Sequence, residues 1–180
     1  MDKETTHAEA VRSRTQLGFW IYLMTDCILF ATLFATFAVL RHSTAGGPGG
    51  EEIFELPFVL IETLVLLTSS FTCGMAILSL HQRQKKAVLG WLAVTFALGI
   101  AFLGMELTEF AKLAAEDYGW WRSGFLSAFF VLVATHGFHI FVGLLWMAIM
   151  AVQLVKQDVT EPVVRRLTLL AMFWHFLDVI

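Results

Sequence analysis

Residues 125–155 read FLSAFFVLVATHGFHIFVGLLWMAIMAVQLV, a stretch that contains no Asp, Glu, Lys or Arg. About 20 apolar residues are enough for an α-helix to cross the ~30 Å hydrocarbon core of a membrane. Three further apolar stretches precede it and one follows, at residues 17–40, 57–80, 88–113 and 163–180. The sequence therefore predicts an all-α integral membrane protein, built as a bundle of five transmembrane helices.

The composition agrees with a membrane domain and argues against other classes. Hydrophobic residues make up 58% of the chain and the mean hydropathy is +0.73, whereas soluble domains are about 45–50% apolar. Residues 1–16 are polar and of mixed charge, and we predict a disordered cytoplasmic tail before one membrane domain over residues 17–180. A net charge of −3 gives no indication of nucleic acid as a partner.

The basic residues predict how the helices are oriented. Of the 12 lysines and arginines, nine fall in the N-terminal tail, in residues 81–87 and in residues 156–166. Loops on the cytoplasmic side are rich in Lys and Arg, so we predict a cytoplasmic N-terminus. Residues 163–180 are short for a complete crossing, and we expect a fifth helix that is truncated at the C-terminus.

The ionisable side chains inside the apolar stretches are mainly carboxyl and imidazole groups. A carboxylate at membrane depth is costly, so it usually faces protein or water and has a partner. We interpret these groups as a proton-handling site or a buried polar network, which comprises Asp26, Glu62, Glu106, Glu109, His136, His139, His175 and Asp178. The chain has no GxSxG or HExxH motif, and we predict no catalytic residue, cofactor or metal in it.

Asp26 lies near the middle of the first predicted helix, because the nine residues that precede it from Leu17 rise about 14 Å. One interpretation is a proton-handling carboxylate that is open to the cytoplasmic side, or a contact to a partner subunit. The other is a protonated acid that a neighbouring helix satisfies. The residues alone leave both interpretations open.

Two pairs of residues predict a contact between the third and fourth helices. Glu106 and Glu109 are three positions apart, as are His136 and His139, so each pair shares one helix face. The two helices are joined by a short connection and are expected to be antiparallel neighbours. This pattern favours a polar network that fixes the helix register over a metal or haem site.

His175 and Asp178 share a face of the last helix, where the acid can orient the imidazole or contact another helix. An alternative function is a bis-His haem-b membrane anchor or electron carrier, with ligands drawn from His136, His139 and His175. A proton-coupled transporter is a third possibility, but it would show inverted repeats, which this sequence lacks.

Four motifs together resemble subunit III of the haem–copper terminal oxidases. They are GFWIYLMTD at residues 18–26, GMELTEF at 104–110, ATHGFH at 134–139 and WHFLDV at 174–179. The resemblance covers residues 17–180. The five-helix pattern, with GGPGG at 46–50 followed by IFELPF at 53–58, is similar to the subgroup found in cytochrome-bo-type ubiquinol oxidases.

This resemblance implies an accessory, non-redox subunit of a proton-pumping ubiquinol oxidase in a bacterial inner membrane. Subunit I and the other partner subunits would then hold the haem groups, the copper and the ubiquinol, and phospholipid would bind to this chain. The chain would stabilise subunit I and support proton uptake. Asp26 matches a buried carboxyl group that is usually Glu in the family, and Glu106 aligns where some members have Gln.

Overall fold

The computed structural model describes residues 2–44, 56–115, 119 and 121–180. Within these residues it contains five α-helices and no β-strand, which confirms the predicted all-helical fold. The helices are α1 (Asp2–Leu40), α3 (Leu56–His81), α4 (Lys85–Ala115), α5 (Gly124–Lys156) and α6 (Glu161–Val179).

Four of the helices are long and apolar enough to cross a membrane. The spans run over Ser13–Leu40, Pro57–His81, Lys85–Ala115 and Gly124–Lys156. Helix α6 has 19 residues and carries charged side chains near both of its ends. At about 1.5 Å per residue it rises slightly less than the ~30 Å of a hydrocarbon core.

The N-terminal segment differs from the sequence prediction. Helix α1 begins at Asp2, so the polar residues that we expected to be a disordered tail are helical. Residues 2–16 contain Glu, Lys, Arg, Gln and Ala, which favour helices, and they contain no Gly or Pro. A polar segment with these propensities can continue a helix that the membrane span has already nucleated.

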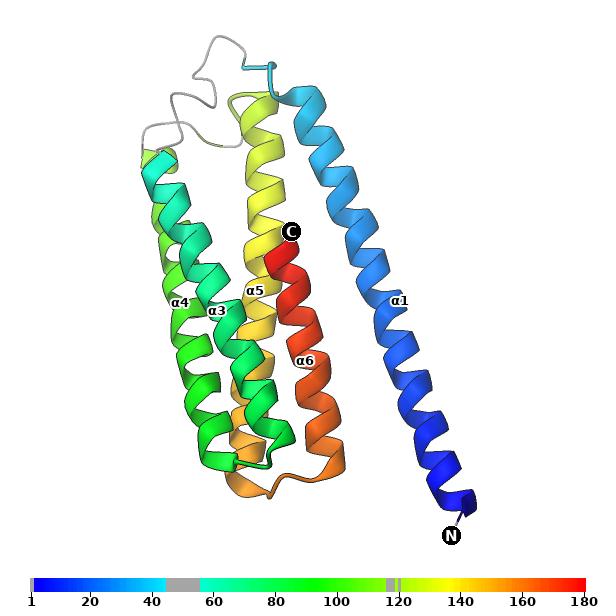
Figure 1. The fold of residues 1–180 in the computed structure, drawn as a ribbon. Helices are drawn as coiled ribbons and strands as arrows, with labels where there is room; N and C mark the ends of the chain where they lie inside the picture. The colour runs from blue at the N-terminus through cyan, green and yellow to red at the C-terminus, as the bar shows by residue number, and fades with distance from the viewer. Residues whose placement is uncertain (1, 45–55, 116–118, 120) are drawn as a thin grey trace.

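Four helices form a closed ring, and the fifth lies against one edge of it (Figure 1). Helix α3 packs against α4, α4 against α5, α5 against α6, and α6 against α3. Helix α1 contacts α5 and α6, and it diverges from the ring toward its N-terminal end. Each pair of neighbours within the ring is antiparallel, in keeping with the short connections from α3 to α4 and from α5 to α6.

The indole of Trp174 lies at the centre of this ring and is 2% exposed. Two glycines make room for the ring system. A Cβ atom on Gly99 of α4 would lie 2.9 Å from the indole, and one on Gly143 of α5 would lie 3.0 Å from it. The indole N–H donates to Ser69 Oγ of α3 at 3.1 Å. One side chain of α6 therefore contacts all three of the other ring helices.

Local hydrogen bonds near residue 83 reverse the direction of the chain between α3 and α4. Arg83 adopts a φ of 56°, in the left-handed region that commonly ends a helix. The backbone N–H groups of Arg83 and Gln84 donate to the carbonyls of Leu80 and Ser79, at 3.0 and 3.1 Å. This turn sets α3 and α4 side by side.

A first prediction concerns the space around Trp174. Gly99→Val would place side-chain atoms against both the indole and Leu144, whose Cδ2 lies 2.8 Å from the position of a Cβ atom. Overpacking of this kind typically costs about 1–3 kcal/mol. We expect a lower midpoint of thermal unfolding in mild detergent.

The matched control is Gly104→Val on the same helix, where a Cβ atom would meet nothing within 4 Å. It should leave the midpoint close to that of the unmodified chain. Equal midpoints for the two variants would contradict the packing assigned to Trp174.

Candidate functional site

Helix α1 buries little of its surface, and what it buries faces α5. Of its described side chains, three are buried, namely Leu23, Asp26 and Phe30. They recur at helical spacing, so they lie on one stripe of the helix. A carboxyl group therefore occupies the middle of the surface by which α1 attaches to the bundle.

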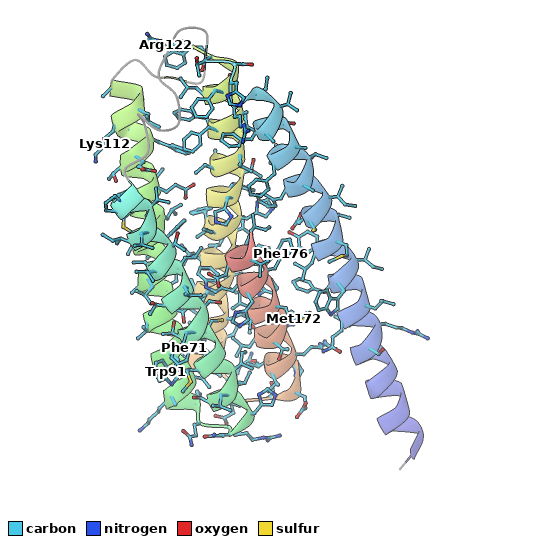
Figure 2. The ribbon with its side chains drawn as sticks, turned by 45° about the horizontal axis from the view of Figure 1, so that its top comes forward. Phe71, Trp91, Lys112, Arg122, Met172 and Phe176 are labelled. Carbon is cyan, nitrogen blue, oxygen red and sulfur yellow. The ribbon has the colours of Figure 1, made fainter. Side chains whose placement is uncertain are left out.

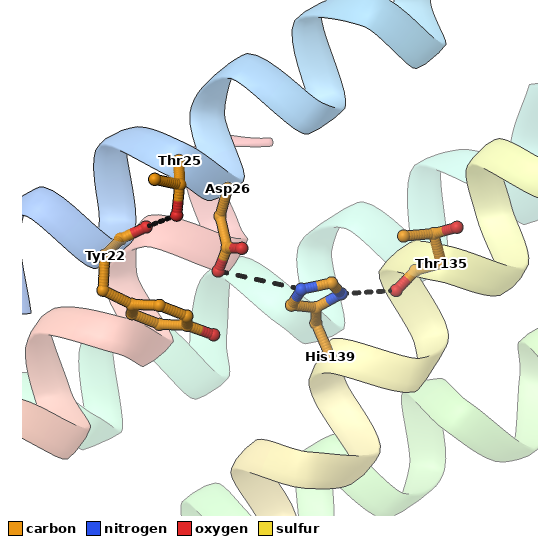
Figure 3. Close-up of polar contacts among 5 residues, drawn as sticks. All are labelled: Tyr22, Thr25, Asp26, Thr135 and His139. Carbon is orange, nitrogen blue, oxygen red and sulfur yellow. Dashed lines mark hydrogen bonds and ion pairs between the residues drawn. The ribbon is translucent and has the colours of Figure 1, made fainter.

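Asp26 faces His139 of α5 across this contact (Figure 3). The distance from Asp26 Oδ2 to His139 Nε2 is 3.7 Å, which is an ion-pair distance rather than a hydrogen bond. Both side chains are largely removed from solvent, at 11% and 14% exposure. On the opposite edge of the imidazole, Nδ1 lies 2.7 Å from the carbonyl oxygen of Thr135.

The partners of His139 fix where its protons lie. A carbonyl oxygen can only accept, so Nδ1 carries a hydrogen and donates to Thr135. In the neutral ring Nε2 then holds a lone pair, which would repel an ionised carboxylate. A favourable contact needs one more proton, either on Asp26 or on Nε2. The pair is therefore a buried contact between a carboxyl group and an imidazole, at an ion-pair distance.

Aromatic rings enclose this pair. The Phe30 ring centroid lies 5.2 Å from that of His139 and 6.2 Å from that of His136. Tyr22 lies one turn before Asp26 on the same face of α1 (Figure 3). The hydroxyl of Thr25 donates to the carbonyl of Tyr22 at 2.6 Å rather than to Asp26. The sequence contained Tyr22 and Phe30 at helical spacing from Asp26, but this signal does not identify their partners.

Glu106 occupies the other side of α5. Its side chain is buried, with the residue 4% exposed, and no described residue hydrogen-bonds to either carboxyl oxygen. A Cβ atom on Gly137 would lie 2.7 Å from both of these oxygens. The missing side chain of Gly137 thus lets the carboxyl group of α4 reach the backbone of α5.

The sequence predicts that the glutamates of α4 meet the histidines of α5. In the structure, Glu106 and His139 lie on different faces of α5. His139 turns to α1, whereas Glu106 meets Gly137, which lies between the two histidines in sequence. Buried atoms of His136 (Nδ1) and Glu62 (Oε1) also have no hydrogen-bond partner among the described residues. Glu109 is half-buried on the same helix as Glu106.

On α6, His175 contacts a serine that the sequence analysis did not single out. Its Nδ1 lies 2.7 Å from Ser70 Oγ of α3. The imidazole is exposed and Asp178 is half-buried. Ser69 and Ser70 are adjacent on α3, and the adjacent Trp174 and His175 of α6 contact them in the same order. Two adjacent serines in a membrane span were the available signal for this contact.

The described residues are not arranged for coordination chemistry. They contain no group of three or more His, Cys, Asp or Glu side chains that would hold a metal ion. Both ring nitrogens of His139 face protein partners, which leaves neither directed at a haem iron.

Comparisons with known proteins agree with the motifs. The sequence profile of the family "Cytochrome c oxidase subunit III" matches residues 2–180. The chain is 58% identical over 166 residues to cytochrome bo(3) ubiquinol oxidase subunit 3 of Pseudomonas putida, covering 92% of this chain and 80% of that protein. It is 53% identical over 174 residues to the subunit of the same name in Pseudomonas aeruginosa, covering 97% and 83%. It is also 43% identical over 164 residues to quinol oxidase subunit 3 of Bacillus subtilis, covering 91% and 80%.

A second prediction follows from the contact between Glu106 and Gly137. Gly137→Ala should displace the carboxyl group and lower the midpoint of thermal unfolding. In the double variant with Glu106→Ala, the added methyl group enters the space that the carboxyl group leaves. The combined loss should then be smaller than the sum of the two single losses, with a coupling of about 0.5–3 kcal/mol. Strict additivity of the two effects would contradict this contact.

Proposed function

The chain belongs to the cytochrome c oxidase subunit III family, and we propose that it is the non-catalytic subunit III of a membrane ubiquinol oxidase. The complex would oxidise ubiquinol, reduce oxygen to water and translocate protons in aerobic respiration. The redox chemistry would take place on haem and copper in partner subunits. This chain would stabilise subunit I and support proton uptake.

The observation that carries the proposal is the extent of the match. The identities of 58% and 53% to bo(3) ubiquinol oxidase subunits extend over 92% and 97% of this chain. They therefore include all five described helices rather than one shared motif. Four helices long and apolar enough to cross a membrane fit a multi-pass protein of a bacterial inner membrane.

The orientation and the lipid contacts are further parts of the proposal. The excess of Lys and Arg at one end supports a cytoplasmic N-terminus. Helix α1 exposes large apolar side chains such as Leu17, Ile21 and Ile28, at 62%, 59% and 65%. We propose that phospholipid chains cover them, because a surface of this kind is stable only in an apolar environment.

The proton role rests on the pair formed by Asp26 and His139. The two groups lie 3.7 Å apart and are largely buried, so a proton taken up by one is readily available to the other. A residue on α1 is also well placed for exchange, because α1 is the least buried of the four helices that could cross a membrane. We propose that this pair accepts and releases protons on behalf of the complex.

A third prediction tests the assignment to a complex. The full chain, tagged at its N-terminus and extracted in mild detergent, should co-purify with a large polytopic subunit that carries haem and copper. Mass spectrometry identifies the accompanying chains and separates a quinol oxidase from a cytochrome c oxidase. Recovery of the chain alone would refute the proposal, and a haem spectrum in that isolated chain would favour the haem-anchor alternative.

A fourth prediction tests the proton role through Asp26→Asn. The carboxamide has nearly the shape of the carboxyl group and can donate to His139 Nε2, so assembly should be intact. It cannot exchange a proton with the imidazole. We expect slower proton uptake and a severalfold shorter catalytic lifetime of the purified complex in sustained turnover.

The control for Asp26→Asn is Asp158→Asn, which removes a carboxylate that is 95% exposed and paired with Lys85 at 3.6 Å. Exposed ion pairs of this kind contribute little, and the variant should behave as the unmodified complex does. Unchanged pumping and lifetime in Asp26→Asn would leave Asp26 with a structural role only.

A further inference from the structure

The outer surface between α3 and α6 contains a groove with an imidazole at its edge. The groove has a volume of about 610 Å³ and is lined by Leu67, Thr68, Ser70, Phe71, Gly74, Met75 and His175. Phe71 is 66% exposed and Leu67 is 57% exposed. Figure 2 shows Phe71 on α3, on the outer side of the ring.

The groove lies at mid-membrane depth. Ser70, which holds His175, is near the middle of the span Pro57–His81. Eleven or more residues separate it from either end of this span, which corresponds to about 17 Å or more of helix rise. Neither water nor lipid headgroups reach this depth of a bilayer.

An imidazole exposed at this depth requires a hydrogen-bond partner. Ser70 satisfies Nδ1 of His175, and no described residue hydrogen-bonds to Nε2. Polar side chains inside a membrane are costly when they face hydrocarbon and therefore face protein or a water-filled cavity. A lipid acyl chain can fill an apolar groove, but it cannot donate to or accept from Nε2.

The groove leaves the backbone of α3 accessible at Gly74. A Cβ atom on Gly74 would meet nothing within 4 Å, so the backbone of α3 is open there to a close neighbour. Small residues at helix interfaces let membrane helices approach closely, and polar side chains hydrogen-bond across such interfaces. The groove combines both features on one face, with Gly74 one turn after Ser70.

We propose that this groove is the docking surface for a transmembrane helix of a neighbouring subunit, which hydrogen-bonds to His175 through an amide, hydroxyl or carboxyl side chain. The inference rests on the proposed function, because it requires a multi-subunit complex. It adds to that function the face of the chain that binds and the chemistry of its partner.

The test uses the complex purified through the N-terminal tag, with a photoreactive benzoyl-phenylalanine in place of Phe71. Irradiation should join this chain to a membrane-spanning peptide of another subunit, identified by mass spectrometry. The same residue in place of Phe138, which is 64% exposed on α5, reports labelling from a different face. Adducts with phospholipid, with a second copy of this chain, or with the same peptides from both positions would overturn the inference.

A second experiment fills the groove. Gly74→Leu should lower the fraction of the partner subunit that co-purifies, whereas Gly104→Leu should retain it, because both glycines have open space around them but lie on different helices. Equal abundance of both variants in the membrane shows that the chain itself folds. Retention equal to that of the unmodified chain in Gly74→Leu would overturn the inference.

The hydrogen bond has its own comparison. His175→Gln keeps a side chain that donates and accepts, and it should retain more of the partner subunit than His175→Leu does. Equal retention in these two variants would overturn the role of Nε2. A complex that purifies intact but shows none of these effects leaves the proposed function standing, whereas failure to recover any haem–copper subunit overturns both proposals.

Discussion

The burial of Trp174 determines how the other helices are placed. Its indole fits between α4 and α5 because Gly99 and Gly143 have no side chains. Its N–H requires an acceptor in a region without water, which Ser69 provides. These three contacts fix the rotation of α6 about its axis and its position along that axis, relative to α3, α4 and α5. The next residue in each helix is then also fixed, and this is why His175 lies against Ser70.

A second constraint comes from the polar groups that the bundle must accommodate. Two buried carboxyl groups lie on different faces of α5, and each is accommodated in a different way. On one face, Asp26 lies at an ion-pair distance from His139. On the other face, the carboxyl group of Glu106 rests on the backbone at Gly137 and has no hydrogen-bond partner among the described residues. In the first arrangement the carboxyl group faces an imidazole, whereas in the second it lies against the helix backbone.

The sequence predicts the helices well and the pairing of their side chains poorly. Long apolar runs and the hydrogen-bonding demands of a bilayer leave little choice of secondary structure. Spacing of three residues places two groups on one face but does not say which helix they meet. Successive residues of a helix are about 100° apart, so Gly137 and His139 point about 200° apart. Once Gly137 contacts α4, His139 must turn toward α1, and the expected contact with Glu106 is not formed. The helical N-terminus was missed because a polar composition was given more weight than helix propensity.

The intramembrane polar groups differ in whether they have a partner within the chain, and this difference bears on the proposed assembly. Asp26 and His139 face each other at an ion-pair distance within the chain, and Trp174 donates a hydrogen bond to Ser69. The imidazole of His175 is satisfied on one nitrogen only and faces outward over an apolar groove. The hydrocarbon of a bilayer offers the other nitrogen no hydrogen-bond partner. The proposed docking helix would make this contact, at a depth that water does not reach.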